Sequence, residues 1–189
     1  MPDLFEVLKS RRSVRAYSDE PVGEEELREL VELAVLAPTA MNLQPWRFSI
    51  ITNRQVLAEV SDRVKALMLE QGIADQIKEK HLEAMLKSEE YNIFYNAPAV
   101  IVISARKENP GAQIDCQLAA ENLFLAAHAK GLGTCYMGFV FFGNGDAKVR
   151  AGLAVAEGYD IMAACTVGWP KSMPQGPPAR RPPEIEWVR

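Results

Sequence analysis

The spacing of apolar residues along the chain predicts several amphipathic helices and a few short strands. Leu27, Leu30 and Val31 fall on one helical face of residues 24–37, and Pro38 follows as a stop. Similar patterns or compositions predict further helices at residues 4–8, 56–68, 113–130 and 146–153. Apolar runs predict strands at residues 46–52, 99–103 and 161–168. The second of these runs is apolar at every position, so we expect it in the centre of its sheet.

The order of these elements favours an α+β or three-layer α/β domain over a doubly wound parallel sheet. Simple strand–helix–strand alternations are few, and two helical stretches follow each other between residues 56 and 90. A length of 189 residues fits a single domain, 1–189. A tail rich in proline and arginine, residues 171–189, closes the chain.

Composition narrows the classes of function. The formal net charge of −4 argues against a nucleic-acid-binding protein, which would carry a basic excess. The two histidines, His81 and His128, lie far apart, so neither a His-rich metal site nor a His-dependent hydrolase is expected. The longest apolar run, residues 97–105, is too short for a membrane span, and the N-terminus does not resemble a signal peptide. We therefore expect a cytoplasmic protein without a metal centre.

The three cysteines, Cys116, Cys135 and Cys165, form no CxxC pair and lie among small or apolar residues. This pattern is typical of buried free thiols in a reducing compartment. A redox-active or nucleophilic cysteine is the alternative interpretation.

Two arginine clusters carry the first sign of a ligand. Arg11, Arg12 and Arg15 surround Ser13, and the tail places Arg180 next to Arg181 between prolines. Guanidinium groups bind phosphate or another delocalised anion through paired hydrogen bonds, so both clusters are candidate anion sites. Solvated surface charge is the alternative for either cluster taken alone.

Two segments rich in small residues are further candidates for ligand contact. Residues 37–46 form a loop pinned by two prolines, in which Asn42 and Gln44 offer paired donors and acceptors to the edge of a ring. Residues 133–139 combine small residues with aromatic ones, which suits a flat ring held against backbone. The alternatives are a structural connection for the first segment and a packed strand end for the second. The Gly131-Leu132-Gly133 sequence follows a helix rather than a strand, so it indicates a helix cap and not a dinucleotide motif.

Taken together, these segments resemble the FMN-dependent nitroreductase family. The order is Arg-Arg-Ser-x-Arg at 11–15, Ala-Pro-Thr-x-x-Asn-x-Gln-Pro-Trp at 37–46, and Asn-Ala-Pro at 96–98 before the apolar strand. Asp115-Cys116 then opens a helix that ends in Gly-Leu-Gly-Thr-Cys-Tyr-Met-Gly-Phe at 131–139. Gly-Trp-Pro at 168–170 and an Arg-Arg-Pro tail complete a match that spans nearly the whole chain.

The resemblance implies a nitroreductase-like α+β fold: a central, mostly antiparallel sheet flanked by helices, in an intertwined homodimer with FMN at the interface. It implies that the residues from 61 to 90 form a lid over the substrate. It also implies a set of FMN contacts within one subunit: Arg11 and Arg180 at the phosphate, Arg181 sharing that load, Arg12 and Ser13 near the phosphate and ribityl chain, Arg15 near flavin N1 and the C2 carbonyl, and Met137 and Gly138 where backbone N–H groups meet flavin N5 and O4. The contacts implied from the other subunit are Pro38, Thr39, Ala40 and Asn42.

The resemblance further implies an enzyme, an FMN-dependent oxidoreductase that takes electrons from NADH or NADPH. Hydride would pass through flavin N5 in a ping-pong cycle to an electron-poor small molecule, such as a nitroaromatic or a quinone. Because the cofactor carries the redox chemistry, no catalytic side chain is required. Two alternatives remain: the same fold with specialised flavin chemistry, either reductive dehalogenation or an acceptor-specific dehydrogenation, and a non-catalytic FMN-binding redox protein.

Overall fold

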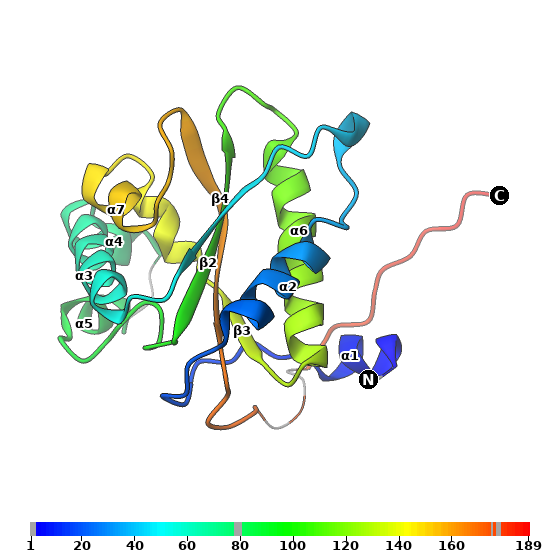
Figure 1. The fold of residues 1–189 in the computed structure, drawn as a ribbon, viewed down its shortest axis with the longest axis horizontal. Coiled ribbons are helices and arrows are strands. Elements are labelled where there is room, and N and C mark those ends of the chain that lie inside the picture. The colour runs from blue at the N-terminus through cyan, green and yellow to red at the C-terminus, as the bar shows by residue number, and fades with distance from the viewer. Residues whose placement is uncertain (1–2, 78–80, 175, 177–178) are drawn as a thin grey trace.

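The computed structural model describes residues 3–77, 81–174, 176 and 179–189, and in them the chain forms three layers (Figure 1). Helices α2 (Glu24–Ala34) and α6 (Ala112–Ala129) cover one face of a four-stranded sheet. Helices α3 (Arg54–Glu70), α4 (Ile73–Ile77), α5 (Leu82–Lys87) and α7 (Ala147–Gly152) cover the other face. The short helix α1 (Leu4–Ser10) packs against α6, and two 3₁₀ turns, η1 (Ala40–Asn42) and η2 (Gly138–Gly143), complete the elements.

The sheet is antiparallel throughout, which confirms the expected α+β class. Its strands are β1 (Arg47–Ile51), β2 (Ala99–Arg106), β3 (Gly133–Tyr136) and β4 (Tyr159–Gly168), in the order β1-β2-β4-β3. Strand β2 lies in the interior of the sheet between β1 and β4, as its uniformly apolar sequence predicts. Strands β1 and β3 are therefore the two edges.

A separate apolar core fills the space on each face of the sheet. Successive side chains of β2 point into opposite cores: Ile101 and Ile103 pack on the side of α2 and α6, whereas Val100 and Val102 pack on the side of α3. All four are fully buried. The sheet thus holds both helical layers rigidly, and the ends of its strands become fixed points for a binding site.

The first part of the segment between residues 61 and 90 belongs to α3 and is more buried than a mobile lid would be. Val64 and Met68 of α3 are fully buried, and the buried Lys65 Nζ donates to the carbonyls of Ser88 (3.1 Å) and Tyr91 (2.8 Å). Residues 78–80 of the expected lid lie outside the described residues, as do 175, 177 and 178 of the tail. A covering role stays a prediction, and it concerns the segment that follows α3.

Candidate functional site

The arginine-bearing segment is held against the edge strand β3. Ser13 pairs with Thr134 in a parallel bridge, and the Val14 N–H donates to the Thr134 carbonyl at 2.8 Å. Gly133 allows this approach, since a Cβ there would lie 2.7–2.9 Å from three side-chain atoms of Val14. Val14 is fully buried, so the neighbouring positions of this extended segment point outward. The backbone contact with β3 therefore fixes where the arginine side chains lie.

Arg180 of the tail meets the first arginine cluster around one hollow of about 320 Å³. Its lining consists of Arg11, Arg12, Ser13, Arg15, Pro174, Gly176 and Arg180. Arg181 is exposed and is not part of that lining. Clustered guanidinium groups in one cavity attract a multiply charged anion and bind its oxygens in pairs, so the hollow is a candidate phosphate site.

The guanidinium groups of this hollow are only partly satisfied by protein acceptors. Arg12 donates from one terminal nitrogen to the carbonyls of Lys9 (2.8 Å) and Arg11 (2.6 Å), while its buried Nε has no acceptor among the described residues. Arg11 Nε lies 3.7 Å from Glu121 Oε1, which is a loose ion pair. A buried donor without a partner costs free energy, which an anion bound in the hollow would recover.

His128 lies close to the first arginine cluster, near Arg11 and Arg12. Its Nε2 lies 2.7 Å from Ser10 Oγ, at the end of α1. Burial, together with the nearby charges of Arg11 and Arg12, lowers the pKa of His128 below its ordinary value. The imidazole is therefore neutral at physiological pH and leaves the positive charge to the arginines.

The end of β3 forms a second, smaller hollow of about 120 Å³ with aromatic walls, lined by Ile93, Tyr95, Tyr136, Met137, Gly138 and Phe139. The Met137 N–H already donates to the Ala164 carbonyl at 2.8 Å. The Gly138 N–H has no acceptor among the described residues, and a Cβ on Gly138 would meet nothing within 4 Å. In the described part of the chain, the Gly138 N–H is thus available to a ligand in this hollow.

Arg15 and Tyr95 join the two hollows. Arg15 lines the phosphate-sized hollow, and its guanidinium carbon lies 5.9 Å above the ring centre of Tyr95, which lines the aromatic one. Tyr95 and the next residue, Asn96, have left-handed backbone angles (φ 55° and 54°). Such angles are costly for residues other than glycine and cluster at functional sites. The combined site has an arginine-rich end and an aromatic end, which matches a flat ring with a phosphate-bearing tail.

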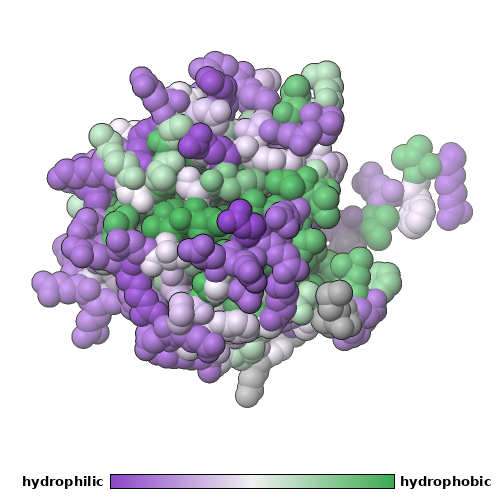
Figure 2. Space-filling view, in the orientation of Figure 1, coloured by the Kyte–Doolittle hydropathy of each residue, from purple (hydrophilic) through white to green (hydrophobic). Residues whose placement is uncertain are grey.

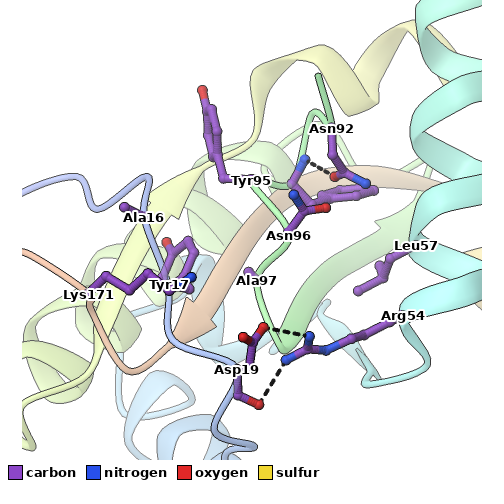
Figure 3. Close-up of a pocket in the computed structure, with 11 residues that line it drawn as sticks. Ala16, Tyr17, Asp19, Arg54, Leu57, Asn92, Tyr95, Asn96, Ala97 and Lys171 are labelled. Carbon is purple, nitrogen blue, oxygen red and sulfur yellow. Dashed lines mark hydrogen bonds and ion pairs between the residues drawn. The ribbon is translucent and has the colours of Figure 1, made fainter. Parts of the chain in front are cut away.

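A third hollow, of about 400 Å³, shares Tyr95 with the aromatic hollow (Figure 3). Of its two cations, Arg54 and Lys171, the arginine is already engaged, donating to the side chain (3.0 Å) and the carbonyl (2.9 Å) of Asp19. Tyr95 in Figure 3 points away from this ion pair. The ion pair leaves Lys171 as the remaining cation of this hollow, against four arginines in the other, so the phosphate is assigned to the arginine hollow.

The loop with Pro38, Thr39, Ala40 and Asn42 lies far from the arginine hollow within one chain. It contacts the first turn of α6, where the Ala40 N–H donates to Asp115 Oδ1 at 3.3 Å, whereas His128 lies in the last turn. At 1.5 Å of rise per residue, these two points are about 20 Å apart along the helix. Figure 1 shows η1 and α1 at opposite ends of α6. A single chain therefore does not bring this loop and the arginines together.

The three cysteines are buried free thiols, as their sequence surroundings predict. Burial raises the pKa of Cys116 and of Cys165 to about 12 and also raises the pKa of Cys135, so these thiols are protonated at neutral pH. In the part of the chain that the structure describes, no cluster of His, Cys, Asp or Glu could hold a metal ion, and no helix is long and apolar enough to cross a membrane.

Comparison with known proteins identifies the fold. A model of the nitroreductase family matches residues 8–169. The chain belongs to the nitroreductase family. A nitroreductase with bound FMN from Bacteroides fragilis has the same fold, with a TM-score of 0.82, 28% identity and 100% of both chains covered.

Two curated relatives show how varied nitroreductase-family proteins are. NADH dehydrogenase of Thermus thermophilus is 30% identical over 191 residues, which cover 92% of this chain and 88% of the relative. Iodotyrosine deiodinase of Thermotoga neapolitana is 28% identical over 137 residues, 71% of this chain and 73% of the relative.

Three features of the site were not foreseen from the sequence. They are the Tyr95 contact with Arg15, the Ser10 contact with His128 and the Asp115 contact with the 38–42 loop. Each joins residues far apart in the chain, or depends on a backbone angle that the residue types do not reveal. A weak local signal existed for Tyr95, because the Asn-Ala-Pro sequence that follows it is typical of a turn.

Proposed function

We propose that this nitroreductase-family protein is an FMN-dependent NAD(P)H oxidoreductase that reduces an electron-poor small molecule, such as a nitroaromatic or a quinone. The observation that carries the proposal is the meeting of Arg11, Arg12, Arg15 and Arg180 around one hollow beside the aromatic hollow at Gly138. The FMN in the Bacteroides fragilis structure and the name of the Thermus thermophilus relative support the cofactor and the electron donor.

The residues present fit FMN at its phosphate end. The arginine hollow of about 320 Å³ exceeds what a phosphate group alone needs, and the unpartnered Arg12 Nε marks a place for an anionic oxygen. Arg11 and Arg180 would bind the phosphate, while Arg12 and Ser13 would serve the phosphate and the sugar-alcohol chain. Arg181 would contribute charge from outside the hollow.

The residues present also fit the ring end of FMN. The Gly138 N–H, beside Met137, offers a hydrogen bond to a ring heteroatom, and the aromatic walls suit a flat ring. Arg15, steadied by Tyr95, keeps a permanent positive charge between the two hollows. When bound, FMN supplies the redox chemistry between the nicotinamide and the acceptor, which explains why the protein needs no catalytic side chain.

We also propose that the active form is a homodimer, because a single chain leaves the site incomplete. The 38–42 loop lies at the far end of α6, so Pro38, Thr39, Ala40 and Asn42 would reach a ring held by another copy. The faces that could meet a second copy carry exposed apolar side chains: Leu4, Phe5 and Leu8 on α1, Ile114 and Leu118 on α6, and Leu36, Met41 and Leu43 around η1. These exposed apolar side chains support an interface with a second copy.

The tail and the β1 edge supply a second part of this interface. Residues 179–189 project from the body of the molecule, and Trp187 is 76% exposed (Figure 1). A hollow of about 370 Å³ between α2 and β1 is lined in part by Val31, Phe48 and Ile50. Figure 2 shows an apolar band across the middle of this face, over β1. The tail of one copy would pair with the unpaired β1 edge of the other, which gives the intertwined arrangement.

The dimer is tested by light scattering of the purified protein. We expect a mass of twice 21.0 kDa for the full chain, and weaker association together with weaker FMN binding after removal of residues 184–189. A stable monomer that binds FMN with unchanged affinity would refute the shared site.

The enzymatic activity is tested by steady-state oxidation of NADH and NADPH by the FMN-loaded protein, with a quinone and with a nitroaromatic as acceptors. We expect turnover with at least one donor–acceptor pair. Tight FMN binding without oxidation of either nicotinamide would instead support the non-catalytic alternative.

The phosphate assignment is tested with Arg11→Ala and Arg180→Ala. A hydrogen bond to a charged group contributes about 1.5–3 kcal/mol, so each variant should bind FMN at least ~10-fold more weakly. Arg106→Ala is the matched control, because Arg106 stacks on Tyr159 away from the site. Equal FMN affinity in Arg11→Ala and Arg106→Ala would rule out the assignment.

A further inference from the structure

The carboxylate of Asp115 is an unusual group in this fold. The residue is only 4% exposed and lies in the first turn of α6. Oδ1 accepts the Ala40 N–H at 3.3 Å, while the buried Oδ2 has no partner among the described residues. An unpartnered buried carboxylate oxygen destabilises a fold, so a packing role alone does not account for an aspartate here.

The loop that Asp115 holds is strained. Met41, Asn42 and Gln44 all have left-handed backbone angles, with φ of 48°, 56° and 45°. Left-handed angles are unfavourable for residues other than glycine, so surrounding contacts must maintain them. Within the loop, the Gln44 N–H donates to Thr39 Oγ1 (3.3 Å) and the Gln44 side chain donates to Asn42 Oδ1 (3.1 Å).

These internal hydrogen bonds shape the loop but do not fix it to the rest of the protein. The hydrogen bond from Ala40 to Asp115 provides that attachment, because it joins the loop to α6. Met41, next to Ala40, is 87% exposed, so the loop presents its tip outward rather than into its own core. The first turn of α6 favours a negative charge, which makes Asp115 a strong acceptor.

We infer that Asp115 is a positioning residue for cofactor binding across the dimer interface. By accepting the Ala40 N–H, it holds the strained 39–44 loop in the shape in which Thr39, Ala40 and Asn42 meet the FMN of the other subunit. The inference rests on the proposed function and adds to it a residue that touches neither cofactor nor substrate. It also explains why an acid occupies a buried position at a cost in stability: the site gains a fixed loop.

The first test compares Asp115→Ala with Asp115→Asn in the full-length dimer. Asp115→Ala removes the acceptor, so FMN binding should weaken by about 10-fold, and the visible circular dichroism of the bound flavin should change because the ring loses a fixed neighbour. Asp115→Asn keeps an oxygen for the Ala40 N–H and should bind FMN within about threefold of the unmodified protein. Gln113→Ala, an exposed change in the same turn of α6, is the control and should leave both readouts unchanged.

A second variant tests the same hydrogen bond from the loop. Ala40→Pro removes the donor without requiring a new backbone shape, since the preceding Thr39 is extended (φ −133°, ψ 149°) and proline is favoured at the first position of a helical turn. Both substitutions remove the same hydrogen bond. The double variant Asp115→Ala/Ala40→Pro should therefore bind FMN no more weakly than whichever single variant binds it less tightly. If Asp115→Ala fails to fold, unchanged FMN affinity in Ala40→Pro still overturns the inference, and Asp115→Asn with FMN affinity within about threefold of the unmodified protein supports it.

The outcomes separate this inference from the proposed function. Unchanged FMN affinity and unchanged flavin dichroism in Asp115→Ala, or in Ala40→Pro, would overturn the positioning role while leaving the oxidoreductase proposal intact. Additive losses in the double variant would also overturn it, because the two residues would then act separately. Failure of the unmodified protein to bind FMN would overturn both.

Discussion

Replacing Gly133 with alanine tests how β3 positions the arginines. The new Cβ would lie 2.7–2.9 Å from three atoms of the Val14 side chain, which is fully buried. Val14 has little room to retreat, because its N–H is bonded to the Thr134 carbonyl at 2.8 Å. Overpacking of a core costs about 1–3 kcal/mol, and about 2–4 °C of Tm is lost per kcal/mol in a chain of this size. The expected loss is therefore about 2–12 °C in Tm for the apo protein.

The same change should weaken FMN binding, because any shift of Val14 also moves Ser13 and Arg15. The assay is thermal unfolding of the apo protein at fixed concentration, followed by titration with FMN. Val14→Ala alone should cost about 2 kcal/mol through the lost methyl groups. In Gly133→Ala/Val14→Ala the added methyl partly fills that space, so the double variant should be more stable than the sum of the single losses by about 1 kcal/mol. Simple additivity, or an unchanged Tm in Gly133→Ala, would refute the contact.

Two further predictions concern titratable side chains outside the aromatic hollow proposed for the flavin ring. Asp146 caps α7 by accepting hydrogen bonds from the N–H groups of Lys148 and Val149, and these bonds, with Arg63, lower its pKa. Asp146→Ala should therefore lower the free energy of unfolding by about 1–2 kcal/mol in chemical unfolding at pH 7. The effect should disappear in strong acid, where the carboxylate is protonated. The lowered pKa of His128 means that the unfolded chain binds the proton more readily, so stability should fall as the pH drops below about 6.5. His128→Gln should flatten that decline, and an identical pH profile in the variant would show that His128 is not its source.

Much of the fold followed from local patterns. The continuous apolar run at 99–103 predicted the interior strand β2, because a strand buried on both faces is apolar at every position. The stripe of Leu27 and Leu30 predicted α2, because a helix buried on one face repeats its apolar residues at helical spacing. The helix predicted for residues 24–37 ends instead at Ala34, and Val35 to Ala37 form a turn before Pro38. The residue before a proline avoids helical angles, which moves the helix end upstream.

The site was less accessible to pattern alone. Gly133 was interpreted as part of a helix cap, yet it opens β3, because its role depends on a contact with Val14 more than a hundred residues earlier in the chain. The convergence of Arg180 with Arg11 was anticipated only through resemblance to the family, since no local signal joins the two ends of a chain. Asp115 was noted as a helix opener, but its hydrogen bond to Ala40 requires the fold to be known.

The most direct test of the proposed function is an anaerobic titration of the FMN-loaded protein with NADH and with NADPH, followed by the visible absorbance of the flavin. We predict that at least one nicotinamide bleaches the flavin band in proportion to the amount added, and that a quinone or a nitroaromatic added afterwards restores it. A flavin band that stays unchanged with both nicotinamides would contradict the assignment of this protein as an NAD(P)H oxidoreductase.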